Sequence, residues 1–295
     1  MQLGIHQFSY PVGEVQPYIN WLYFFHAWGL SGKPASEQAD LRREAEAMLC
    51  EFRQRGFQTR ALVGLFEAYS QGDDIVVKPP LTPPGEKENP AWGRDGKDFS
   101  LPMLRQQRPA RAGQPNLCLA DYLRPAGCGQ KDHIGIFAAT MPHTVETDFG
   151  HEPYQKMLAQ TLADRLAEAT AERLHLEVRR RIWGYAPDEQ LTIDQLHQEA
   201  FQGIRPAVGY PSLPDTSINF VIAQLLGIAD IGIRLTESGM MVPHASVSGL
   251  MFAHPQARYF DLGKIGDDQL RDYARRRRVP VELMRRFLST SLLDE

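Results

Sequence analysis

The sequence is poor in cysteine and contains no paired cysteine motif. Three cysteines, Cys50, Cys118 and Cys128, occur in 295 residues, and none belongs to a C-x-x-C pair. An odd count without that spacing argues against a disulfide framework and against a structural zinc site, and it favours a reducing compartment such as the cytoplasm. The N-terminus lacks a basic region followed by an apolar core, and the apolar runs are too short to cross a bilayer. We therefore expect neither a signal peptide nor a membrane partner.

A strong excess of one charge is also missing. The formal net charge is -4 at pH 7, with 43% hydrophobic and 23% charged residues, which is ordinary usage for a globular protein. The charge balance gives no reason to expect a nucleic acid as a partner.

The common catalytic motifs are absent too. No G-x-G-x-x-G follows a predicted strand, and neither a Walker A loop nor a G-x-S-x-G elbow occurs. The stretch "HEPYQ" begins like a zinc-protease motif, but Gln155 stands where the second histidine is needed. The sequence thus argues against the common nucleotide-binding, zinc and serine-hydrolase classes. We predict no metal ligand and no catalytic acid, base or nucleophile.

Hydrophobic periodicity predicts several helices. An aromatic-rich helix is expected over 15–33, ending at Gly32, and an amphipathic helix over 36–56. The longest helix is expected over 154–183, with a core stripe formed by Leu158, Leu162 and Leu166. Further helices are predicted over 193–201, over 219–228 and, at the C-terminal end, over 267–289.

Alternating segments predict strands between these helices. Strands are expected within 1–16, on both sides of the "QGDD" turn in 59–77, over 132–141, and near 232–238 and 245–255. Residues 79–116 are rich in proline, glycine and charge, which predicts an irregular excursion within one domain. Because the elements show no βαβ regularity, we expect an α+β fold with a central twisted antiparallel sheet flanked by helices.

One loop is unusually stiff. "GIRPAVGYPSLPD", residues 203–215, places Pro206 directly after Arg205 and Pro211 directly after Tyr210, and these prolines fix φ. On the loop alone, two interpretations stand level. Either it is a helix connector whose arginine pairs with a neighbouring acid, or it is pre-organised for a ligand with a carboxylate.

Ten blocks in fixed order decide between them. They are "NWLYFFHAWGLSGK", "VGLFEAYSQGDDI", "CLADYL", "LADRLAEATAERLH", "WGYAPDE", "QGIRPAVGYP", "LTES", "ASVSG", "FAHPQARYF" and "DYARRR". Together they resemble the C-terminal reactivation domain of cobalamin-dependent methionine synthase, from about residue 3 to residue 287. The resemblance implies one activation domain over 1–295. No cobalamin domain is expected, because the cobalamin-binding D-x-H-x-x-G is absent, and the chain leaves no room for homocysteine and folate domains.

The resemblance implies a function. A domain of this family binds S-adenosylmethionine and supports the reductive methylation of cob(II)alamin to methylcobalamin, which rearms the methyltransferase for methionine biosynthesis. The cobalamin is carried by a partner domain or subunit, and a flavodoxin-like protein supplies the electron. The chain would be an excised domain or a separate subunit, and not a complete enzyme alone. Two alternatives stay open: a reactivator of another corrinoid methyltransferase, and a docking module that senses S-adenosylmethionine without using it.

The resemblance also implies ligand-binding residues in the stiff loop. Arg205 would bind the methionyl carboxylate, Gly209 would allow close backbone approach, and Ala207 and Tyr210 would meet the adenine. Tyr259 would lie beside the sulfonium, where a cation–π contact is favourable. Phe260 replaces a second family tyrosine, and a role as a core aromatic is the better interpretation for it.

Three polar positions complete the expected site. Glu168 is expected to face the ligand cleft. For Asp164, four residues earlier, a solvated face balanced by Arg165 and Arg173 is an equal alternative. Asn20 stands where the family commonly has an aspartate that contacts the ligand's amino group, so a weaker ammonium contact is expected.

Two further features have less specific interpretations. Glu237 in "LTES" is expected to be structural. The arginines of the C-terminal helix, Arg275–Arg278 with Arg271, Arg285 and Arg286, predict a solvated face. The less favoured alternative is that these arginines bind an acidic electron donor.

Overall fold

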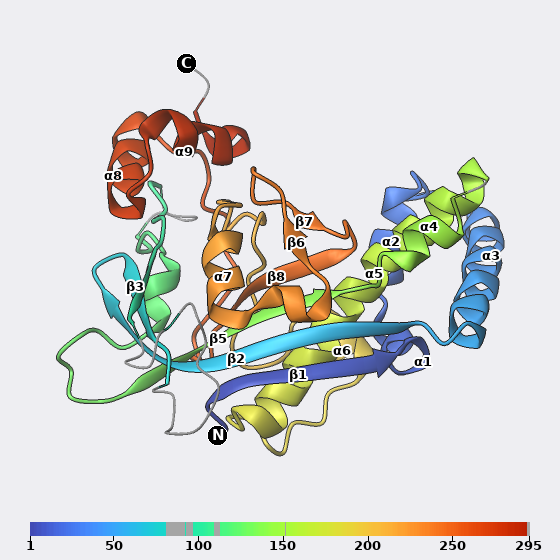
Figure 1. Ribbon diagram of the computed structural model, residues 1–295, viewed down its shortest axis with the longest axis horizontal. Coiled ribbons are helices and arrows are strands. Elements are labelled where there is room, and N and C mark those ends of the chain that lie inside the picture. Colours follow the sequence, from blue (N-terminus) through green and yellow to red (C-terminus); the bar gives the residue numbers. More distant parts are fainter. Residues whose placement is uncertain (81–91, 93–96, 109–112, 151, 294–295) are drawn as a thin grey trace.

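An antiparallel sheet forms the centre of the fold. The computed structural model describes residues 1–80, 92, 97–108, 113–150 and 152–293. Five strands run in the order β4-β3-β2-β5-β8, and β1 also pairs with β2 (Figure 1). The strands are β1 (Gly4–Pro11), β2 (Gln58–Gln71), β3 (Asp74–Lys78), β4 (Phe99–Pro102), β5 (Asp132–Thr140) and β8 (Ser246–Met251), with β6 (Arg234–Leu235) and β7 (Met241–Val242) in a separate ribbon. The predicted α+β fold with a helix-flanked antiparallel sheet is confirmed.

The long strand β2 organises this sheet. Its first part pairs with β1 on one side and β5 on the other, and its last residues, Glu67–Gln71, pair with β3. The β2–β3 hairpin turns at Gly72, whose φ of +63° suits glycine, at the predicted "QGDD" turn. The excursion expected over 79–116 contains the edge strand β4, which the sequence did not predict. Much of that excursion lies outside the described residues.

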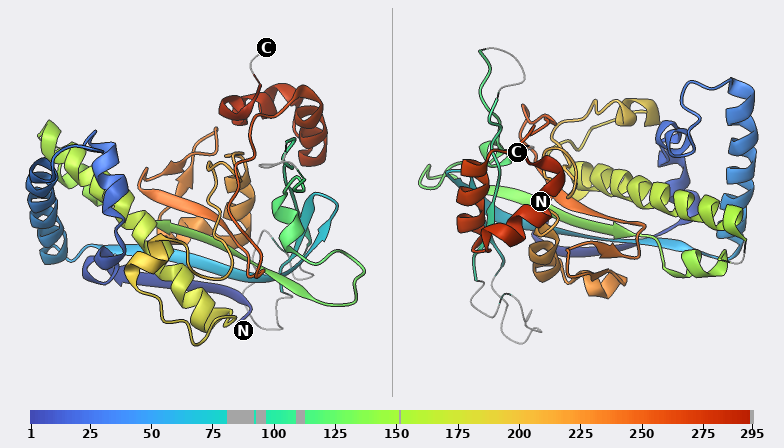
Figure 2. Two further views of the ribbon diagram at one scale, coloured as in Figure 1. Left: turned by 180° about the vertical axis from the view of Figure 1, so that it is seen from behind. Right: turned by 90° about the horizontal axis from the view of Figure 1, so that it is seen from above.

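The helices lie on both faces of the sheet and at its two ends. They are α1 (Val12–Val15), α2 (Trp21–Ala27), α3 (Ala35–Gln54), α4 (Thr144–Asp148), α5 (Pro153–Glu177), α6 (Ile193–His197), α7 (Ile218–Leu226), α8 (Asp267–Arg277) and α9 (Val281–Phe287). Short 3₁₀ segments are η1 (Gln16–Tyr18), η2 (Leu119–Tyr122), η4 (Ile228–Ile231) and η5 (Ser289–Ser291), and the π-helical η3 (Val178–Ile182) continues α5. Figure 2 shows α8 and α9 at one end and α2–α4 at the other.

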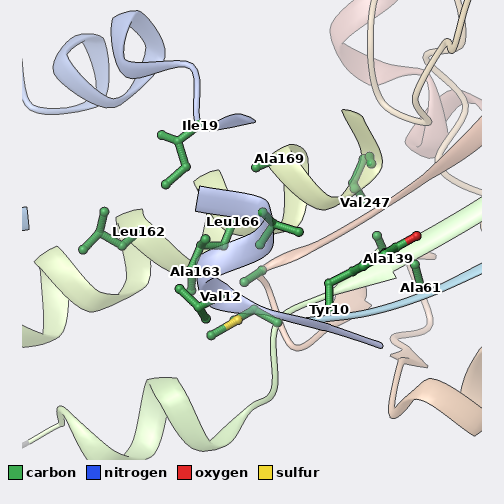
Figure 3. Packing of buried hydrophobic residues seen from close by; sticks show 14 of the residues in the cluster. Tyr10, Val12, Ile19, Ala61, Ala139, Leu162, Ala163, Leu166, Ala169 and Val247 are labelled. Atoms are coloured by element: carbon green, nitrogen blue, oxygen red, sulfur yellow. The ribbon is translucent and has the colours of Figure 1, made fainter. Parts of the chain in front are cut away.

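Alternation along the strands divides the core in two. Ala61 and Val63 of β2 point toward the cluster beneath α5, whereas Leu62 points toward the cluster beneath α7. On the α5 side, Leu162, Ala163 and Leu166 of the helix belong to one buried cluster with Ala61 and Ala139 of the sheet (Figure 3). Small residues at this contact let the helix lie close to the sheet. The stripe of leucines predicted for α5 is therefore confirmed as core.

Two predicted helices are shorter than expected, and a third, expected over 267–289, is divided into α8 and α9 because Arg278 has a φ of +55°. The helix expected over 15–33 is interrupted because Pro17 forms part of η1 and Asn20 caps a new helix, α2, which ends at Ala27. The helix expected over 193–201 ends at His197, and Glu199 has a φ of +57°, which no helix continues.

Candidate ligand-binding site

A cleft of about 760 Å³ opens beside α5. Its walls come from α2, from α5, from the chain around α6, from the stiff loop, and from the segment that follows β8. The candidate residues that line it are Asn20, Glu168, Arg205, Ala207, Tyr210, Tyr259 and Phe260. The structure thus brings together most of the side chains predicted from distant parts of the sequence. Asp164 and Gly209 are not among the lining residues.

The stiff loop is an irregular extra strand along β8. The amide of Val208 donates to Ser248 O at 2.9 Å, and Leu250 N donates to Pro206 O at 3.0 Å. A Cβ at Gly249 would lie 2.2 Å from Pro206 O, so only glycine permits this approach. A proline is tolerated at such an edge because its missing amide is not needed for pairing. The loop's stiffness therefore fixes its position against the sheet.

Arg205 is held in place at both its backbone and its side chain. Its amide donates to the Tyr259 hydroxyl at 2.9 Å, and its Nη2 donates to Glu172 Oε2 at 2.7 Å. The two charged side chains are only 12% and 11% exposed. Burial opposes the charge of Arg205, but Glu172 and then Tyr259 outweigh it, so the pKa of the guanidinium is raised. Arg205 therefore pairs with an acid and also lines the cleft, so the two interpretations of the loop do not exclude each other.

Tyr210 and Glu168 form a second pair across the cleft. The Tyr210 hydroxyl donates to Glu168 Oε1 at 2.8 Å. Burial first, and the neighbouring carboxylate second, raise the pKa of Tyr210, so it stays a neutral donor at physiological pH. Gly209, with a φ of +89°, makes the turn that presents this tyrosine, and its amide donates to Leu213 O.

Asp164 contacts a histidine, and neither the ligand cleft nor Arg173 is its neighbour. Its Oδ1 lies 3.1 Å from Nδ1 of His244, in the segment between β7 and β8. Burial raises the pKa of Asp164, and the adjacent imidazole partly opposes that rise. Arg173, expected as a balancing cation, pairs instead with Glu14 and Glu177. Arg173 is therefore not a balancing cation for Asp164, whereas the charge of Arg165 does lower the pKa of that carboxyl.

Asn20 and the aromatic pair lie at the cleft margin. Asn20 Oδ1 accepts a hydrogen bond from Leu22 N at 3.1 Å and so caps α2. The Tyr259 hydroxyl is engaged by Arg205, and burial, only partly offset by that arginine, raises its pKa. Phe260 is half-buried and packs against the cluster beneath α7 and the cluster around α8. It serves as a core aromatic that also lines the cleft.

Sequence reasoning missed several lining residues. Glu172 follows Glu168 at the same four-residue spacing that singled out Asp164 and Glu168, so that pattern could have found it. Glu199 and Asp261 line the cleft as well. Apart from histidines, the lining holds four carboxylates, of Glu168, Glu172, Glu199 and Asp261, and two guanidiniums, of Arg165 and Arg205. The wall therefore favours a ligand that carries positive charge.

The C-terminal arginines are not a uniformly solvated face. Arg276 pairs with Asp272 and Asp74, and Arg277 with the buried Asp215, so both side chains turn inward. The solvated-face prediction is wrong for these two, because the molecule's own carboxylates bind them. Glu237 is exposed, in the turn between β6 and β7.

Other classes of site find no support within the described ranges. No group of three or more His, Cys, Asp or Glu there could hold a metal ion. Likewise, none of the helices described is long and apolar enough to cross a bilayer.

The fold and the cleft together define an α+β domain whose cleft has the size of a small-molecule site. A family model for the activation domain of vitamin B12-dependent methionine synthase matches residues 11–278. The chain belongs to this family. It is also similar to the crystal structure of the MetH reactivation domain bound to AdoHcy. The two are 35% identical, the match covers 100% of this chain and 92% of that one, and the TM-score is 0.86. The family resemblance seen in the sequence is confirmed.

Proposed function

We propose that this chain binds S-adenosylmethionine in the cleft and supports the reductive methylation of a cobalamin, so that a methionine synthase regains activity. The observation that carries the proposal is Arg205, buried at the cleft wall and fixed by Tyr259 and Glu172. A rigid guanidinium suits the carboxylate of an amino-acid ligand. The similar reactivation domain has AdoHcy bound, and AdoHcy is the demethylated form of S-adenosylmethionine. This supports S-adenosylmethionine as the ligand.

The cleft matches such a ligand in size and chemistry. Its volume of about 760 Å³ lies within the range of about 300–1,000 Å³ usual for small-molecule pockets. Tyr259 and Phe260 offer aromatic surface for an adenine or a sulfonium, and Ala207 leaves room beside them. The excess of carboxylates complements the positive charge that S-adenosylmethionine carries and its demethylated form lacks.

The chemistry requires positioning from this chain. The methyl group leaves the sulfonium as a formal cation, and the sulfur keeps the bonding electron pair. A flavodoxin-like donor would supply one electron to the partner's cob(II)alamin, which would then have the electron pair for the new bond. A cobalamin bound to the partner domain or subunit supplies the cobalt that accepts the methyl group. No proton moves in this transfer, so Arg205, Tyr210 and Glu168 contribute by holding and orienting the donor.

The need for a cobalamin-carrying partner determines how this chain is used in the cell. The chain acts as a module of a methyltransferase, either within a longer protein or as a separate subunit. Its three cysteines are free, which supports a reducing, cytoplasmic environment.

Labelled methyl transfer tests the proposal. The protein is mixed with a partner loaded with cob(II)alamin, a reductant and methyl-labelled S-adenosylmethionine, and the label on cobalt is measured. We expect transfer with the natural chain. With Arg205→Ala we expect a loss of roughly tenfold or more, because a charge-assisted contact is removed. Binding without transfer would instead support a sensing module, and absence of binding would defeat the proposal.

A further inference from the structure

The ion pair between Glu172 and Arg205 is incomplete on both sides. Glu172 Oε2 accepts from Arg205 Nη2 at 2.7 Å, but Glu172 Oε1 is buried without a hydrogen-bond partner among the described protein atoms. Arg205 Nε is likewise buried and unpartnered. Glu172 is buried as a whole residue and lines the cleft. Native proteins seldom leave such groups unsatisfied, and an unused acceptor beside an unused donor suits a ligand that carries both charges.

Asn20 does not fill the role that its position suggests. Its side-chain oxygen accepts the hydrogen bond that caps α2, which leaves one lone pair and no negative charge to receive an ammonium. The amide nitrogen of Asn20 is a donor and cannot bind a cation. The nearest full negative charge to Arg205 is the Glu172 carboxylate.

The geometry of an amino acid links the two residues. Its carboxylate and ammonium groups sit on one carbon, so a ligand whose carboxylate contacts Arg205 brings its ammonium beside the partner of that arginine. We infer that Glu172 is the specificity-determining residue for the ligand's ammonium group. The Arg205–Glu172 pair then recognises the zwitterionic end of the ligand as one unit. This inference rests on the proposed binding of S-adenosylmethionine.

The test compares two ligands that differ only in the α-amino group. Calorimetry measures binding of S-adenosylmethionine and of its desamino counterpart to the full chain. We expect the natural protein to bind the desamino compound roughly tenfold to a hundredfold more weakly, since a charge-assisted hydrogen bond is lost. In Glu172→Gln this ratio should fall below about threefold. Any misplacement of Arg205 weakens both ligands alike and leaves the ratio unaffected.

A matched control uses the same chemical change on the same helix. Asp164→Asn replaces a carboxylate that does not line the cleft, so the ratio should remain that of the natural protein. If Glu172→Gln does not fold, Glu172→Asp keeps a charge for Arg205 but shortens its reach, and the ratio should again fall several-fold.

The outcomes separate the two proposals. A ratio that persists in a folded Glu172 variant overturns the inference. So does a ratio that collapses in Glu199→Gln instead, since Glu199 is another acid of the cleft. A natural protein that binds both ligands equally also overturns it and leaves the proposed function intact. Failure of the natural protein to bind S-adenosylmethionine at all defeats the proposed function.

Discussion

Asn20 begins α2 and lies at the cleft, and its one side-chain oxygen serves the helix. An aspartate there would cap the helix equally well, because both residues are favoured N-caps. It would also provide a second acceptor oxygen and a full negative charge at the cleft wall. The departure from the expected aspartate therefore affects ligand binding more than it affects the helix.

We predict that Asn20→Asp tightens binding of S-adenosylmethionine by roughly threefold to tenfold, because a neutral group is replaced by a charged one at a partly exposed position. The dissociation constant measured by calorimetry checks this. Asn20→Ser keeps a capping oxygen without the charge and should change the constant by less than about twofold. An unchanged constant in Asn20→Asp would show that residue 20 does not contact the ligand's charge.

Single residues also show where the sequence is informative and where it is not. Arg205 and Tyr210 could be predicted because the loop's composition and the family motif mark them. Glu172 could not be assigned a partner, since it meets Arg205 across 33 positions of the chain. Asp164 was ambiguous for the same reason: its partner, His244, is 80 positions away, and nothing local to either residue indicates the contact.

Helix α5 has a polar face in addition to its leucine stripe. Glu168, Glu172 and His175 follow one another on that face, and Arg179 continues it into the π-helical η3. Each has a partner in the segment 185–210: Tyr210, Arg205, Tyr185 and Glu189 in turn. We call the four residues of this face the polar column of α5. The periodicity of apolar residues predicted the helix and its leucine stripe but not the polar column, because a buried polar face has the same sequence pattern as a solvated one.

The polar column predicts a pH dependence through His175. Burial, reinforced by Arg179 and Arg205, holds the pKa of His175 well below the ordinary 6.5, so the folded state keeps it neutral. The unfolded chain binds a proton near pH 6.5 that the folded chain does not. Stability should therefore fall as pH decreases below about 6.5, by up to about 1.4 kcal/mol per pH unit from this group alone.

Urea unfolding at several pH values measures this effect. The free energy of unfolding of the natural chain should decline more steeply below pH 6.5 than that of His175→Gln, which carries no titrating ring. His6, a partly exposed histidine on β1, provides the control, because His6→Gln should leave the slope unchanged. Parallel curves for the natural chain and His175→Gln would contradict a neutral buried imidazole.

At the scale of the whole molecule, α8 is tied to the end of the stiff loop. Asp215 is 1% exposed and accepts a hydrogen bond from the Tyr273 hydroxyl at 2.8 Å. Arg277 lies 3.4 Å from the same carboxylate and donates to Ser217 Oγ. The C-terminal arginines that suggested a docking face thus include residues that join two parts of the fold.

We predict that Asp215→Asn destabilises the protein by about 3 kcal/mol, because it leaves the charge of Arg277 buried without its counter-ion. Chemical unfolding monitored by circular dichroism checks the value. Asp272→Asn makes the same change at an exposed ion pair of α8 and should cost less than about 1 kcal/mol. Equal losses in the two variants would show that burial of the Asp215 network contributes nothing.

The cleft is assembled from segments that range from Tyr18 to Asp261, so no short stretch of chain can form it alone. A ligand that binds there recognises only the folded state, and its binding energy adds to the stability of the whole domain. At a free concentration one hundred times its dissociation constant, the addition is about 2.7 kcal/mol. If that ligand is the proposed S-adenosylmethionine, its supply in the cell sets how long this protein survives proteolysis.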